Sequence, residues 1–222
     1  MKRQIIVTSD GSTTIHLPEW NEQYHSKHGA IQEAYHVFIR NGLEAISKSN
    51  ISILEIGFGT GLNAFITCIE AKKNNLNINY VGVEAYPVAL DEVAKLNYVS
   101  ELKATQFNEL FQKMHLDSWE QRHTVSEAFT LEKRQQFFHK IDDKNLYDLI
   151  YFDAFGARVQ PDLWTEEIFA KMFDALRENG ILVTYSAKGS VRRAMQAVGF
   201  VVERLPGPPG KREMLRGTKK SA

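Results

Sequence analysis

A glycine-rich turn between two ordered segments is the first feature of this sequence that could carry chemistry. It reads LEIGFGTGLNAF from Leu54 to Phe65 and places glycines at 57, 59 and 61. Glycine lacks a Cβ, so the backbone of such a turn can approach a ligand closely, and the helix that follows offers unpaired N–H groups. The pattern predicts a site for a nucleotide-like cofactor; a turn that merely connects strand to helix is the alternative.

The spacing of the glycines separates two classes of cofactor. The dinucleotide fingerprint needs Gly or Ala where Leu62 stands, counted from Gly57, and leucine is too large for close helix packing. No Tyr-x-x-x-Lys pair occurs either, so an NAD-dependent oxidoreductase is disfavoured. With Glu55 the segment reads E-x-G-x-G-x-G and resembles the opening motif of class I S-adenosylmethionine-dependent methyltransferases. The resemblance implies that the loop touches the methionine part of the cofactor and that the acid lies near its amino group.

Two acids at the ends of apolar runs extend the candidate site. Glu84 ends INYVGVE, twenty-three residues beyond Gly61, where a carboxylate can accept hydrogen bonds from both ribose hydroxyls. Asp153 follows YDLIYF, and open α/β sheets bind ligands at such carboxyl ends. A carboxylate there can hold an amine and accept a proton as the nitrogen attacks a sulfonium methyl group, so Asp153 is the predicted catalytic residue. The alternative is an Asp that caps the next turn. Phe155 would offer an aromatic wall on which a base could stack.

Short apolar segments alternate with longer helical ones from residue 51 onward, as in parallel βαβ units. Strands are expected at 51–56, 78–84, 147–155, 181–187 and 200–207, and helices at 62–73, 87–96, 165–177 and 190–198. The helix at 165–177 is expected to close at residues 178–180. We therefore expect a Rossmann-like, doubly wound, mostly parallel α/β sheet. The segment PGPPGKREML predicts an antiparallel hairpin and hence an antiparallel C-terminal edge strand.

An N-terminal extension precedes this pattern. β-Branched residues flank Asp10 and Gly11, a pair suited to a tight hairpin turn, and residues 31–46 show helical spacing. With 222 residues and 43% hydrophobic content, we expect one methyltransferase domain at 51–218, with the hairpin-helix extension 1–50 packed on it. No apolar run is long enough to cross a membrane and the N-terminus lacks a signal core, so a cytoplasmic protein is expected.

Longer motifs make the resemblance specific. The segments EIGFGTGLN, VGVEAYP, YFDAFGARVQPDLWT, GILVTYSAKGSVRRAMQAVGF and PGPPGKREML, with YHSKHGAIQEAYHVFI upstream, are similar to the tRNA 5-methylaminomethyl-2-thiouridine methyltransferases over residues 24–217. The resemblance implies N-methylation of the primary amine of wobble 5-aminomethyl-2-thiouridine, with S-adenosylmethionine as cofactor, S-adenosylhomocysteine as product and the tRNA anticodon stem-loop as partner. Many members carry a flavin oxidoreductase domain downstream; this sequence ends before one and resembles the stand-alone form, without flavin.

The resemblance also implies roles for individual residues. On the cofactor side these are Tyr24, Gly29, Glu55, Gly57, Phe58, Gly59, Thr60, Gly61, Asn63 and Glu84. On the substrate side, together with Asp153, they are Phe155, Lys188, Arg192, Arg193, Lys211 and Arg212. The sequence departs from the family pattern in one place. Members often show a Gly-Asp pair after the third strand to meet the adenine, whereas this chain has Lys133, Arg134 and Gln135, so no adenine contact is assigned.

The charge distribution and the remaining reactive residues indicate which partners and metal sites to expect. Formal net charge is zero, yet residues 188–220 hold nine Lys or Arg and two acids, which fits a polyanionic partner and equally a solvated face. The lone Cys68 predicts a buried packing residue. No Cys or acid at ligand spacing completes a site with His25 and His28, so no metal is expected. Core packing is also expected for the aromatic residues Phe107, Phe111, Phe137, Phe138 and Trp164.

Three other functions stay open. A small-molecule amine methyltransferase or an aminopropyltransferase would use an acid at the same strand end, and its activity should survive loss of the basic C-terminal segment. A non-catalytic tRNA-binding module would keep the fold without binding the cofactor. An NAD oxidoreductase is weakened by Leu62.

Overall fold

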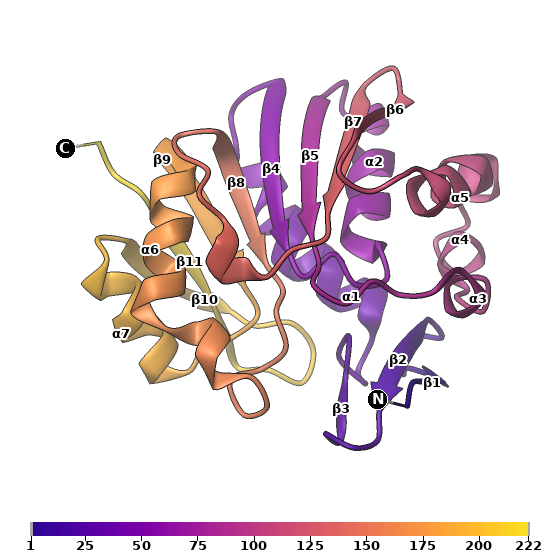
Figure 1. The fold of residues 1–222 in the computed structure, drawn as a ribbon, viewed down its shortest axis with the longest axis horizontal. Coiled ribbons are helices and arrows are strands. Elements are labelled where there is room, and N and C mark those ends of the chain that lie inside the picture. The colour runs from indigo at the N-terminus through magenta and orange to yellow at the C-terminus, as the bar shows by residue number, and fades with distance from the viewer. Residues whose placement is uncertain (1, 222) are drawn as a thin grey trace.

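An eight-stranded mixed sheet forms the centre of the protein (Figure 1). The computed structural model describes residues 2–221. The strands are β4 (Asn50–Ile56), β5 (Asn77–Val83), β6 (Arg122–Ser126), β7 (Phe129–Arg134), β8 (Tyr147–Phe152), β9 (Leu176–Thr184), β10 (Val201–Pro206) and β11 (Glu213–Thr218). Their order is β10-β11-β9-β8-β4-β5-β7-β6, and the five strands from β9 to β7 run parallel. The order reverses between β4 and β8, so the predicted doubly wound, mostly parallel α/β fold is confirmed.

Both edges of the sheet carry antiparallel pairs. The C-terminal hairpin predicted around residues 206–215 is present, because β10 pairs antiparallel with β11. Strand β11 is antiparallel to β9 and lies one place in from the edge, while β10 forms the edge itself. At the opposite edge β6 pairs antiparallel with β7. Strand β6 was not predicted from the sequence.

Helices cover both faces of the sheet. Figure 1 shows α2 (Leu62–Lys73), α3 (Leu90–Val93), α4 (Tyr98–Glu101) and α5 (Asn108–Leu116) on one side, and α6 (Glu166–Ala175) and α7 (Gly189–Ala197) on the other. Helix α2 begins where the pattern predicts, directly after Gly61, whose φ of 72° glycine adopts without strain. Within residues 2–221, no helix combines the length and the apolar character needed to span a bilayer.

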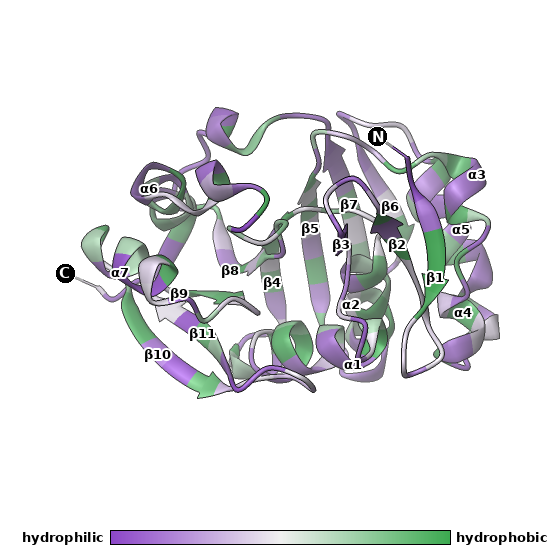
Figure 2. Cartoon of the chain, turned by 90° about the horizontal axis from the view of Figure 1, so that it is seen from below, coloured by the Kyte–Doolittle hydropathy of each residue, from purple (hydrophilic) through white to green (hydrophobic). Residues whose placement is uncertain are grey.

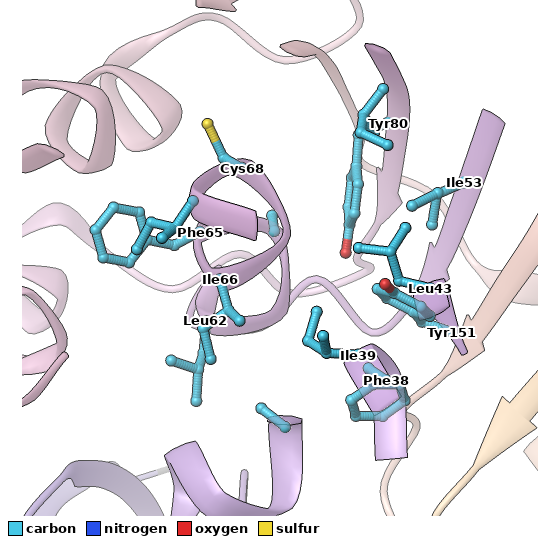
Figure 3. Close-up of a cluster of buried hydrophobic side chains, with 14 of the residues drawn as sticks. Phe38, Ile39, Leu43, Ile53, Leu62, Phe65, Ile66, Cys68, Tyr80 and Tyr151 are labelled. Atoms are coloured by element: carbon cyan, nitrogen blue, oxygen red, sulfur yellow. The ribbon is translucent and has the colours of Figure 1, made fainter. Parts of the chain in front are cut away.

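Two hydrophobic clusters fill the space on the two faces. Figure 3 shows side chains of α2 beside Tyr80 of β5 and Tyr151 of β8, with Phe38 and Leu43 of the N-terminal extension in the same cluster. The second cluster joins α6 and α7 to the sheet. Predicted burial is confirmed for five residues: Cys68, Phe107, Phe111, Phe138 and Trp164. The prediction for Phe137 is wrong, because its side chain is 49% exposed and lines a cavity.

The N-terminal extension forms a small sheet and an irregular helix. Strands β1 (Gln4–Val7) and β2 (Thr13–Leu17) make the predicted hairpin around Asp10 and Gly11, and the short β3 (Glu22–Gln23) pairs with β2. Helix α1 (Ala30–Ala34) continues as a π-helical segment, Tyr35–Arg40, and a 3-10 turn, Leu43–Ala45. Seen from below in Figure 2, the small sheet lies in front of one end of the central sheet. Side chains of the helical part of the extension pack in the same hydrophobic cluster as α2. A boundary at residue 50 between the extension and the methyltransferase domain therefore stays a prediction.

Tertiary contacts shift two of the predicted helix boundaries. The helix expected at 165–177 ends at Ala175, because Leu176 is fully buried and pairs with Tyr147 as the first residue of β9. Residues 178–180 therefore lie within β9, where the register shifts, and do not close the helix. The helix expected at 87–96 is reduced to α3. After α3, the side-chain oxygen of Asn97 accepts the backbone N–H of Thr13 at 2.7 Å, which ties this segment to the N-terminal hairpin.

Candidate active site

A cavity of about 900 Å³ lies at the carboxyl ends of the central strands. Gly57 follows β4, Glu84 follows β5 and Asp153 follows β8, and all three line it. Residues 20–28 of the extension line it from the other side. The volume matches cavities that enclose ligands of cofactor size, and this is the place where doubly wound sheets bind them. The topology thus brings together three residues predicted separately from the sequence.

The glycines of the loop stand where neighbouring groups leave no room for a Cβ. Gly57 has a φ of 91°, and a Cβ there would lie 2.5 Å from the carbonyl oxygen of Asp153. A Cβ on Gly59 would lie 3.1 Å from the Tyr24 ring. Both residues line the cavity with Phe58 and Thr60. Gly61 does not line it; this residue precedes α2 and packs against His115. The loop therefore presents backbone to the cavity between β4 and the extension.

Glu84 supports this loop and retains capacity to bind a ligand. The backbone N–H of Gly59 donates to Glu84 Oε2 at 3.1 Å, and that of Tyr86 donates to Oε1 at 3.0 Å. Each carboxylate oxygen has a further lone pair. Glu84 lines the cavity, and its contact with the hydroxyls of a ribose stays a prediction.

Asn63 links two acids beneath the loop. Its Nδ2 donates to Glu55 Oε1 and to Asp153 Oδ2, both at 2.9 Å. Glu55 is fully buried and does not line the cavity, and burial raises its pKa well above the ordinary value. Among the described residues, Asn63 Oδ1 and Glu55 Oε2 are buried without a partner. Asn63 lines the cavity, and its amide joins the buried Glu55 to Asp153 at the cavity wall.

Asp153 has the protonation behaviour of a base that works near neutrality. Burial raises its pKa to about 7, and the Glu33 carboxylate acts in the same direction. The hydrogen bond from Asn63 and the charge of Lys211 act against this rise. A carboxylate with such a pKa can accept a proton at neutral pH and release it again. Its backbone N–H donates to Ile56 O at 2.9 Å, which fixes the end of β8 against β4.

Aromatic side chains form part of the cavity wall, and Tyr24 among them packs against the glycine loop. Tyr24 and Phe155 make an edge-to-face contact at 4.9 Å between ring centroids, and Trp20 packs on Phe155 at 5.7 Å. Arg3 lies 5.9 Å from the Tyr24 ring centroid and donates to Tyr86 O at 2.9 Å, which ties the extension to the segment after β5. Burial raises the pKa of Tyr24 to about 12, so it stays neutral.

Not all predicted site residues reach the cavity. Gly29 packs against Asp10 before α1, where a Cβ would lie 2.6 Å from Asp10 Oδ2. Of the predicted substrate-side residues, Phe155 and Lys211 line the cavity. Lys188 and Arg212 line a shallow neighbouring hollow of about 430 Å³, which also includes Lys211. The two arginines of α7, Arg192 and Arg193, line neither space.

Several residues of the cavity wall were missed from the sequence. Among them are Glu33, Tyr86, Phe137 and Tyr185. Glu33 had a detectable signal, because it is an acid at helical spacing among Ala30, Ala34 and Val37, on the face that α1 and the following turn bury. Tyr185 directly follows β9, at the same sheet edge as Asp153. Within residues 2–221, no three His, Cys, Asp or Glu residues are grouped as metal ligands.

Replacing Glu84 with alanine should weaken binding of S-adenosylmethionine by about 10- to 100-fold, because charge-assisted hydrogen bonds to hydroxyls are lost. Isothermal titration calorimetry measures this directly. Asp91→Ala provides a control, since that exposed carboxylate pairs with Lys95 and neither residue lines the cavity. An affinity that is equal in the Glu84 variant and the parent would rule out the ribose contact.

Fold and site together define a nucleotide-binding α/β protein of the class I methyltransferase type. The family model described as S-adenosyl-L-methionine-dependent methyltransferase matches residues 99–220, more than half of the chain. The chain belongs to this family.

Curated relatives are similar over nearly the whole chain. The tRNA 5-methylaminomethyl-2-thiouridine biosynthesis bifunctional protein MnmC of Hydrogenovibrio crunogenus is 27% identical over 235 residues, covering 97% of this chain and 34% of the relative. The protein of the same name from Delftia acidovorans is 30% identical over 221 residues, covering 91% and 33%. The chain thus spans about a third of the length of these relatives.

A solved structure supports the fold. The structure of MnmC2 from Aquifex aeolicus superposes with a TM-score of 0.79 at 24% identity, covering 100% of this chain and 71% of that one. Spermidine synthase from Thermotoga maritima superposes with a TM-score of 0.56 at 14% identity, covering 97% and 72%. At these identities both likenesses concern the fold alone.

Proposed function

We propose that this protein transfers the methyl group of S-adenosylmethionine to the exocyclic primary amine of wobble 5-aminomethyl-2-thiouridine in tRNA. The products would be the methylaminomethyl base and S-adenosylhomocysteine. The observation that carries the proposal is the position of Asp153 in one cavity with the glycine loop and Glu84. The names of the relatives support a tRNA nucleoside as the acceptor.

The residues of the cavity fit the cofactor. Gly57 and Gly59 present backbone to the cavity where neighbouring groups leave no room for a Cβ, and Glu84 offers a carboxylate to the ribose. The exposed rings of Tyr86 and Phe137, 6.0 Å apart between centroids, offer apolar faces at the rim. When bound, S-adenosylmethionine supplies a methyl group on a positively charged sulfur.

Asp153 performs the part of the reaction that belongs to the protein. An aminomethyl group in water is largely protonated and cannot act as a nucleophile. The ionised Asp153 attracts this cation and takes one proton, which leaves a neutral amine in the cavity. Phe155, Tyr24 and Trp20 cover the other side and exclude water, which strengthens the interaction between the amine and Asp153.

The test is transfer of labelled methyl to tRNA that lacks the methylaminomethyl group, followed by nucleoside mass analysis. We expect the label in methylaminomethyl-2-thiouridine, and we expect the same product with an anticodon stem-loop carrying the aminomethyl base. Label in small amines and none in tRNA would overturn the substrate and favour a small-molecule amine methyltransferase. Absence of any heat with S-adenosylmethionine in calorimetry would instead favour a non-catalytic tRNA-binding module.

A further inference from the structure

A partly buried ion pair joins the N-terminal extension to the C-terminal hairpin at the wall of the cavity. Glu33 of α1 pairs with Lys211, which precedes β11, although the two residues are 178 positions apart. The other carboxylate oxygen of Glu33 accepts the backbone N–H of Ser26 at 3.0 Å, so the acid is held from two sides. Glu33 is 6% exposed, and both partners line the cavity.

The position of Lys211 is fixed by more than this pair. Its Nζ lies 3.8 Å from the centroid of the Tyr185 ring, within the range of a cation–π contact. The hydroxyl of Tyr185 donates to Ala154 O at 2.8 Å, and Ala154 follows Asp153 directly. A continuous series of contacts therefore leads from Glu33 through Lys211 and Tyr185 to the strand end that carries Asp153.

We infer that Glu33 and Lys211 are positioning residues for the acceptor amine. Glu33 holds the ammonium of Lys211 on the face of Tyr185, and Lys211 in turn neutralises Glu33. Glu33 is thus occupied by Lys211, and the carboxylate of Asp153 is left to bind the incoming amine. The inference rests on the proposed function, because it assigns a task within the same site.

The balance of charges explains why a lysine is required there. When Glu33 and Asp153 are both ionised, the pair of acids and Lys211 carry a net charge of −1, which attracts one cation and leaves one base for its proton. Glu33 raises the pKa of Asp153 and Lys211 lowers it. The other titratable groups that interact with Asp153 are Glu55 of β4, Tyr80 of β5, Tyr98 of α4 and Tyr185 after β9. Without Lys211, two uncompensated carboxylates would share the cavity, and the pKa of Asp153 would rise further.

The test measures the ionisation of Asp153 directly, by carbon-13 NMR of carboxyl-labelled aspartates, with the Asp153 signal assigned from its absence in Asp153→Asn. Lys211→Met should move the titration midpoint of Asp153 up by about one pH unit, because a nearby cation is lost. Glu33→Gln should move it down, because a like charge is lost and Lys211 is free to act on Asp153. The acid limb of kcat/KM against pH should shift in the same opposite directions.

Controls separate this role from a purely structural one. Arg216 and Glu203 form an exposed ion pair of 3.0 Å on the same hairpin, so Arg216→Met and Glu203→Gln should leave the midpoint unchanged. Lys211→Arg keeps the charge and should restore the parent midpoint. The inference is overturned if Lys211→Met and Glu33→Gln lower activity equally at every pH and leave the Asp153 midpoint in place. The titration requires no tRNA, so its outcome is independent of whether the proposed substrate is correct.

Discussion

Replacing Asp153 with alanine is expected to reduce methyl transfer by about 10²- to 10⁴-fold while S-adenosylmethionine still binds. The carboxylate is lost from the acceptor end, so the amine is neither attracted nor deprotonated there. The glycine loop and Glu84, which contact one another through the Gly59 N–H, stay in place to hold the cofactor. Single-turnover transfer to tRNA measures the first effect, and calorimetry with S-adenosylmethionine measures the second.

Asp162→Ala is the matched control for this experiment. Asp162 is exposed, follows the same strand and does not line the cavity, so its removal should change neither quantity. Asp153→Asn tests the charge separately from the shape, since an amide at this position retains the size of the side chain but cannot serve as a base. Turnover at the parental rate in either Asp153 variant would remove the catalytic assignment.

Replacing Gly57 with alanine should abolish measurable cofactor binding and destabilise the fold. The added Cβ would lie 2.5 Å from the Asp153 carbonyl oxygen, and the φ of 91° is one that alanine adopts only with strain. A cost of roughly 2–3 kcal/mol in the free energy of unfolding is expected, since either the loop or the end of β8 must move. For a chain of this size, such a loss lowers the melting temperature by roughly 4–12 °C.

Thermal unfolding followed by circular dichroism checks the loss of stability, and calorimetry checks the loss of affinity. Gly156→Ala is the control for stability, because a Cβ there meets only the Tyr185 hydroxyl, at 3.7 Å. If the Gly57 variant melts with the parent and binds S-adenosylmethionine equally well, close backbone approach at this turn is not what the site requires.

The parts of the structure that the sequence predicted are those set by local pattern. The runs ending at Ile56, Val83 and Phe152 are apolar because both sheet faces are covered, and each end is marked by a glycine or an acid. Since parallel strands bring their carboxyl ends to one edge, the meeting of Gly57, Glu84 and Asp153 follows from the βαβ order. The start of α2 at Leu62 is also set locally, because Gly61 adopts a positive φ directly before the helix.

The parts that escaped prediction depend on contacts between distant segments. No local pattern relates Glu33 to Lys211, because the pairing exists only after α1 and the C-terminal hairpin have both docked. Leu176 has the spacing of a helix residue, yet burial in β9 decides its conformation. Phe137 is an apolar residue of a type that usually packs in a core. It lies instead at the rim of the cavity, where a ligand can cover it.

The pairing of Glu33 with Lys211 also sets an order of events during synthesis. A nascent chain displays Glu33, the glycine loop and Asp153 long before Lys211 leaves the ribosome. Until then the extension lacks its ion pair with the C-terminal hairpin, and Glu33 and Asp153 line the cavity without the charge of Lys211. This wall of the cavity is therefore completed only after the C-terminal hairpin has been synthesised, so a product that ends before residue 211 would keep the glycine loop and lack the ion pair beside Asp153.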